Sequence, residues 1–64
     1  MKSYSSREVI AILKSNGWYL YKVRGDHYQF KHMYNVQKVT VPHPNKDLPI
    51  GTIKSISKQS GIEF

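Results

Sequence analysis

One histidine follows a glycine-aspartate pair, in Gly25-Asp26-His27, within a strongly basic chain. Histidine is the only side chain whose ordinary pKa lies near neutrality, so it can take a proton from a ribose 2′-hydroxyl or give one to a departing 5′-oxygen. Lys22, Arg24 and Lys31 are close to it in the sequence and could hold the phosphate between those oxygens. His27 is therefore the candidate catalytic residue, and the three cations are candidate RNA-binding residues.

Spacing alone gives this hypothesis little support. A histidine at the start of a strand is more often structural or simply solvated than catalytic. One imidazole cannot readily make both proton transfers at once, so a lysine, His43, a tyrosine or water must supply the second.

The other two histidines have simpler interpretations. His32 is expected to be partly buried and hydrogen-bonded to a backbone carbonyl. His43 lies between two prolines in a stiff loop, where a surface histidine needs no function. The three histidines are five and eleven residues apart and the chain has no cysteine, so no zinc motif is present.

Several classes of enzyme can be set aside. The four glycines are scattered, so there is no glycine-rich phosphate-binding loop, and four acidic residues offer no clear pair for two-metal hydrolysis. We therefore expect no metal and no cofactor, and a metal-independent mechanism if the protein is a nuclease.

Charge and composition indicate the partner and the compartment. A net charge of +6 on 64 residues favours capture of a polyanion, with nucleic acid as the leading class. The absence of cysteine fits a reducing cytoplasm, no apolar run is long enough to cross a bilayer, and no secretory signal is visible at the start. We expect a cytoplasmic protein with no membrane association.

Helices are predicted at the two ends of a single domain spanning residues 1–64. Ser5-Ser6-Arg7-Glu8 has the spacing of a capping box, and Gly17 closes a helix over about 6–16. A second helix is predicted over about 49–60, with Ile50, Ile53 and Ile56 on its apolar side and a glycine after it.

Three strands are predicted between these helices. Residues 18–24 and 27–33 are rich in aromatic and β-branched types, and Gly25-Asp26 between them suits a type II′ turn. Residues 34–37 are read as a second connection, and 38–41 as a half-buried strand ended by Pro42. The predicted fold class is α+β, in the order α-β-β-β-α, with a three-stranded antiparallel sheet covered on one face by two helices.

Alternation assigns the strand residues to two faces. Val39, Val41 and Phe30 should face the helices with Tyr28 and His32, which leaves His27, Gln29 and Lys31 on the opposite face. Trp18 and Leu20 are expected in the core, which turns Tyr19, Tyr21 and Val23 outward, whereas the reverse register would bury the tyrosines. Lys22 and Arg24 then fall on the other side of the strand, from which their long stems could still bend toward the hairpin turn. The tyrosines at 19, 21, 28 and 34 could stack on bases, but packing in the core and on the sheet is favoured in so small a domain.

Taken together, these motifs resemble the HicA toxin family, which is also grouped with YcfA-like proteins. The resemblance covers nearly the whole chain and rests on the order and spacing of several short pieces: Asn16-Gly17-Trp18, Gly25-Asp26-His27 with Phe30, Val39-Thr40-Val41-Pro42-His43, and Leu48-Pro49-Ile50-Gly51-Thr52-Ile53 with Ile56 and Gly61.

This resemblance implies a fold like that of double-stranded-RNA-binding domains and an mRNA-cleaving endoribonuclease, the toxin of a type II toxin–antitoxin pair. It implies that His27 is the key catalytic group. It also implies a HicB-type antitoxin that covers the active site, with any oligomer formed through that antitoxin. Two alternatives remain open at this point: a non-catalytic or inactivated double-stranded-RNA-binding-like module, and a purely structural or protein-binding domain.

Overall fold

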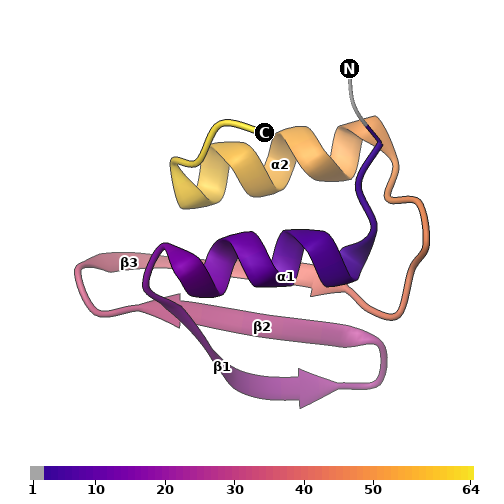
Figure 1. Ribbon diagram of the computed structural model, residues 1–64. Coiled ribbons are helices and arrows are strands. Elements are labelled where there is room, and N and C mark those ends of the chain that lie inside the picture. The colour runs from indigo at the N-terminus through magenta and orange to yellow at the C-terminus, as the bar shows by residue number, and fades with distance from the viewer. Residues whose placement is uncertain (1–2) are drawn as a thin grey trace.

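The computed structural model describes residues 3–64 and has the predicted order of elements. The elements are α1 (Ser6–Ser15), β1 (Trp18–Arg24), β2 (His27–His32), β3 (Asn35–Pro42) and α2 (Ile50–Ser60). The strands form one antiparallel sheet in the order β1-β2-β3, and both helices lie on the same side of it (Figure 1). The predicted α+β class and the α-β-β-β-α order are confirmed. Within residues 3–64, no helix combines the length and apolar character needed to cross a membrane.

The capping box at the start of α1 is present in full. The Glu8 N–H donates to Ser5 Oγ over 3.2 Å, and the Ser5 N–H donates to Glu8 Oε1 over 3.0 Å. These bonds satisfy backbone donors that an α-helix leaves without partners in its first turn. At the other end the chain leaves the helix through Gly17, whose φ of 89° lies in the left-handed region that favours glycine.

The β1–β2 hairpin closes as predicted through Gly25 and Asp26. Gly25 has a φ of 60°, whereas no non-glycine residue among those described has a positive φ. A type II′ turn needs a positive φ only at its first central residue, whereas a type I′ turn would need one at Asp26 as well. The turn places His27 at the first position of β2, directly opposite Arg24.

The connection predicted over residues 34–37 is wrong. β2 and β3 are joined by Met33 and Tyr34 alone, and β3 already begins at Asn35. The first part of β3 is hard to recognise in the sequence because Val36 is fully exposed and the register with β2 is irregular between Phe30 and His32. Backbone pairing defines a strand there, although the burial that produces an alternating pattern is missing.

α2 begins after Pro49 and ends at Gly61, which has a φ of 75°. Ile53 and Ile56 are buried on its apolar side, as predicted, but Ile50 is 57% exposed. Ile50 is the first residue of the helix, and its side chain lies outside the layer between helix and sheet.

The core lies between the two helices and the sheet. Its buried members come from every helix and strand and from the loop before α2: Val9, Leu13, Trp18, Phe30, Val39, Val41, Leu48, Ile53 and Ile56. Leu20, which was expected in this core, is 40% exposed. It lies opposite Phe30 on the helix-covered face, but β1 is an edge strand and the helices do not fully cover it.

Replacing Gly17 by alanine should destabilise the protein by about 1–3 kcal/mol, because the residue combines a positive φ with a close contact. A Cβ at this position would lie 2.7 Å from His32 Nε2, closer than real Cβ contacts allow. Urea denaturation of Gly17→Ala measures the loss.

Gly51→Ala is the matched control, because a Cβ there would meet nothing within 4 Å and the residue lies in α2. Its free energy of unfolding should be unchanged or raised by up to about 1 kcal/mol. Equal stability of Gly17→Ala and wild type would contradict the steric argument.

Candidate functional site

The face of the sheet away from the helices, called here the outer face, carries the candidate catalytic histidine. Phe30 is completely buried under the helices, so its neighbours Gln29 and Lys31 point to the opposite side of β2, as does His27. The predicted orientation of β2 is therefore confirmed. His27 is exposed, with 59% of its side chain accessible, and its Nε2 lies 3.6 Å from Asp26 Oδ1, which is also exposed.

A β-bulge in β1 corrects the predicted orientation of Lys22 and Arg24. Leu20 pairs with Phe30 but Lys22 pairs with Gln29, so Tyr21 is an extra residue in the ladder. Residues directly opposite each other in an antiparallel pair share a face, and an extra residue reverses the alternation beyond it. Val23 therefore lies on the helix-covered side, opposite Tyr28.

Because of this reversal, Lys22 and Arg24 lie on the outer face and not on the helix side. Arg24 lies directly opposite His27, and Lys22 lies opposite Gln29, two pairs further along the same strands. Side chains in such cross-strand pairs have Cβ atoms about 5 Å apart. The bulge thus places a guanidinium directly opposite the imidazole and an amine two residues further along the same face. Strict alternation hides this arrangement because nothing in the sequence marks Tyr21 as the bulged residue.

Lys31 shares the outer face but lies away from His27. It is four residues further along β2, which corresponds to about 13 Å of strand. Its Nζ lies 4.4 Å from the centre of the Tyr21 ring, a cation–π distance, and Lys38 Nζ lies 5.6 Å from the same centre. The Tyr21 hydroxyl donates to Gln29 Oε1 over 2.9 Å. The outer face therefore has two basic regions, one beside His27 and one around Tyr21.

Lys38 was not among the predicted site residues, although alternation could have identified it. Val39 is completely buried, so Lys38 must point to the opposite side of β3. Lys38 is the first residue of the strand predicted over 38–41, so its side of that strand followed from the sequence, whereas its closeness to Tyr21 depends on how the strands pair.

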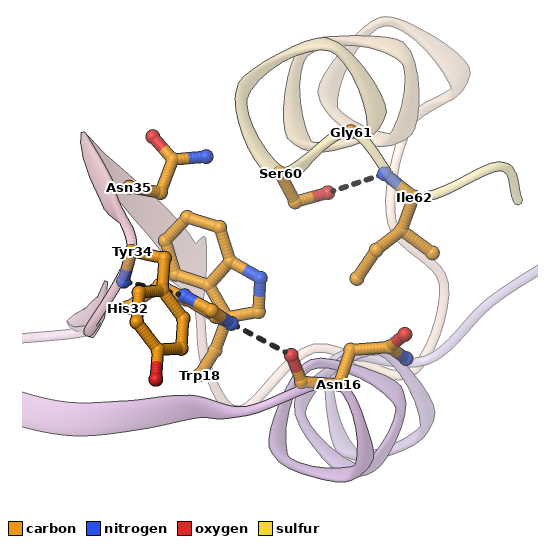
Figure 2. Close-up of a pocket in the computed structure, with 8 residues that line it drawn as sticks. All are labelled: Asn16, Trp18, His32, Tyr34, Asn35, Ser60, Gly61 and Ile62. Carbon is orange, nitrogen blue, oxygen red and sulfur yellow. Dashed lines mark hydrogen bonds between the residues drawn. The ribbon is translucent and has the colours of Figure 1, made fainter.

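His32 has the structural role predicted for it (Figure 2). The Tyr34 N–H can only donate, and it reaches His32 Nδ1 over 3.1 Å; the Asn16 carbonyl can only accept, and it lies 3.0 Å from Nε2. A ring protonated at Nε2 alone satisfies both bonds. His32 also packs edge-on against Trp18, with ring centres 5.1 Å apart. It joins the end of α1 to the β2–β3 turn and borders a pocket on the helix side of the sheet.

His43 is also held on the helix side of the sheet and does not face His27. Its Nδ1 is hydrogen-bonded to the Oγ of buried Ser6 over 2.6 Å, and its ring packs edge-on against Tyr28. Ser6 Oγ also accepts the Asn45 N–H over 2.8 Å. These bonds tie α1 to the loop that follows β3. Among residues 3–64, no three His, Asp or Glu side chains gather closely enough to hold a metal ion.

Replacing Ser6 by alanine should cost about 1–3 kcal/mol of stability, because it removes the hydroxyl that serves both the Asn45 N–H and His43 Nδ1. Thermal or urea unfolding checks this value. Ser55→Ala, at an exposed position on α2, is the control and should change stability by less than about 0.5 kcal/mol. Equal effects at the two serines would contradict a structural role for the Ser6–His43 bond.

Comparison with known proteins agrees with the fold and with the sequence motifs. A family model described as the HicA toxin of bacterial toxin-antitoxin systems matches residues 6–62. The match contains every helix and strand from α1 to α2 and includes all four candidate site residues. A search of curated proteins found no match. Because the model spans nearly the whole chain, the protein belongs to the HicA family of toxins from toxin–antitoxin systems.

Proposed function

We propose that this toxin is an endoribonuclease that cleaves mRNA with His27 as its key catalytic group. The observation that carries the proposal is the placement of Lys22 and Arg24 by the β-bulge on the same face and at the same end of the sheet as His27. An exposed imidazole beside two cations is suited to a phosphodiester. The membership of the family supports the toxin role, and the basic charge supports a polyanionic substrate.

The chemistry we propose is attack of a ribose 2′-oxygen on the adjacent phosphorus. His27 takes the proton from the 2′-hydroxyl, the bond from O2′ to phosphorus forms, and the bond from phosphorus to the 5′-oxygen breaks. A second group gives a proton to the departing 5′-oxygen. The products are a 2′,3′-cyclic phosphate and a free 5′-hydroxyl, and no metal-activated water is required.

Arg24 and Lys22 take different parts in this proposal. The guanidinium of Arg24 suits a phosphate because its planar N–H groups can bind two oxygens together, and it lies directly opposite His27. The Lys22 ammonium is our candidate for the second proton carrier. His43 is disfavoured for this role because its ring lies on the other side of the sheet, bonded to Ser6.

The proposed partners follow from the same surface. A HicB-type antitoxin would inhibit the toxin by covering the outer face, and acidic groups would complement Lys22 and Arg24 there. Oligomers would form through that antitoxin. The proposed place of action is the cytoplasm, where mRNA is available.

The open position of His27 favours one alternative, a non-catalytic RNA-binding module. Three pockets on the helix side are bordered by other residues, among them His32 and His43, whereas 59% of the His27 side chain is exposed. A solvated histidine between cations would also contribute to plain phosphate binding. Loss of cleavage with retained binding in a His27 variant separates the two functions.

His27→Ala should lower the rate of RNA cleavage by about 10²–10⁴-fold, the usual contribution of a general acid or base. Expression of this variant should not arrest growth, whereas wild type should. Because His27 is exposed, its thermal unfolding and salt-dependent RNA binding should stay close to those of wild type. Cleavage at the wild-type rate by the purified variant would rule out the proposed mechanism.

Removing Lys22 and Arg24 together should weaken RNA binding more than removing two lysines elsewhere. The matched control is Lys54→Ala with Lys58→Ala on α2, which removes the same charge from the other side of the molecule. For single-stranded RNA, the slope of log affinity against log salt should fall by about 0.7 for each lost phosphate contact. Equal losses in the two double variants would show that net charge alone, and not this face, binds RNA.

A further inference from the structure

The outer face also carries a tyrosine that the proposed chemistry does not use. Tyr19 lies opposite Lys31 in the β1–β2 ladder, before the bulge, and so points away from the helices with it. Its side chain is 51% exposed. It lies at the end of the outer face far from His27, because the pairs Tyr19–Lys31 and Arg24–His27 are at opposite ends of the hairpin ladder.

Tyr19 differs from its neighbour Tyr21 in what surrounds its ring. Tyr21 is partly buried, donates its hydroxyl to Gln29 and has Lys31 over its ring. Neither tyrosine belongs to the core or to the residues packed against it, and Tyr19 is the more exposed of the two. The general expectation that the tyrosines serve packing therefore holds for Tyr28 against the core and for Tyr21 on the sheet surface, whereas Tyr19 is half exposed and Tyr34 is 88% exposed.

The charge around Tyr19 complements a nucleic-acid strand. Lys22, Arg24, Lys31 and Lys38 all lie on the outer face, and they extend from the His27 end of the sheet to the surroundings of Tyr21. The four acidic residues of the chain are Glu8, Asp26, Asp47 and Glu63. Only Asp26 lies next to this face, in the hairpin turn, while the others belong to α1, the loop before α2 and the C-terminal segment.

We infer that the outer face binds RNA as an unpaired strand, with a base stacked on Tyr19 and the phosphates held by the lysines that lead to His27. This inference rests on the proposed function and names the form of its substrate. An aromatic ring on an open sheet face can stack only on a base whose own face is free. In a duplex both faces of each internal base are covered by its neighbours, so a duplex could contact the lysines along the outer face but could not stack an internal base on the Tyr19 ring.

This placement gives Tyr19 a positioning role. About 13 Å of strand separates its level on the ladder from that of His27, so the ring does not reach the reacting phosphate. The stacked base would fix how the strand lies across the face and therefore which phosphate reaches the imidazole. Tyr19→Ala should raise KM for a single-stranded substrate and leave kcat within about twofold.

The direct test measures binding in a His27→Ala background, in which the RNA probe is not cleaved. The probe is a fluorescent RNA of about eight nucleotides, within the site sizes of single-strand binders, used alone and annealed to its complement. Adding Tyr19→Ala should weaken binding of the single strand by about tenfold, the order expected for one stacked base. Adding Tyr19→Phe should preserve binding, and neither change should alter duplex binding.

Tyr34→Ala is the matched control. Tyr34 is 88% exposed but borders the pocket on the helix side with Trp18 and His32 (Figure 2), so its loss should leave single-strand binding unchanged. Equal affinities with and without Tyr19→Ala would overturn the inference, as would an equal effect on the duplex. Unchanged RNA binding with weakened antitoxin binding would also overturn it and make the face a protein interface.

Different results would contradict the nuclease proposal and this inference. If protein with His27 intact does not cleave RNA, the nuclease mechanism is wrong, yet a tenfold effect of Tyr19→Ala on single-strand binding would still support the inference. If cleavage occurs but KM and binding do not respond to Tyr19→Ala, only the inference is wrong.

Discussion

The pairing of β1 with β2, and the one extra residue within it, determines which side chains of β1 face the core and which face the outer side of the sheet. Before Tyr21, the alternation of β1 sends Trp18 into the core and Tyr19 outward; after Tyr21, it sends Lys22 and Arg24 outward. Without the bulge, the same sequence would turn these two cations toward the helices and away from His27. A bulge costs regular pairing at one position, but here it places two charged side chains in solvent at the end of the hairpin where the histidine lies.

The sheet separates two groups of side chains with different roles. On the helix side, His32 and His43 hold elements together: one joins the end of α1 to the β2–β3 turn, and the other joins α1 to the loop after β3. On the outer side, His27 has an exposed side chain with the carboxylate of Asp26 nearby. A core this small gains from such polar ties, because a short chain buries a modest share of its surface. His27, unlike His32 and His43, has an exposed side chain, and it is the histidine on which the proposed chemistry depends.

In the proposed function, the outer face would bind both the substrate and the inhibitor. Both helices lie on the other side of the sheet (Figure 1), and the charged side chains on the outer face are mostly lysine and arginine. Tyr19, at one end of this face, is half exposed. An RNA strand or an acidic protein surface would find the same cations there. Competition for this one face is therefore the way in which we propose that the toxin is inhibited.

The sequence by itself determined the α-β-β-β-α order, the capping box, the hairpin turn at Gly25-Asp26, the inward side of β2 and the family, because each depends on neighbouring residues or on a regular period. It determined the structural role of His32 in general terms, but not its partners. Only the tertiary structure decided the bulge at Tyr21, the early start of β3 at Asn35 and the partial exposure of Leu20. These features depend on how strands pair and on which part of the sheet the helices cover. Neither leaves a local pattern in the chain, so the grouping of Lys22 and Arg24 with His27, and the separation of Lys31 from it, could be seen only in the fold.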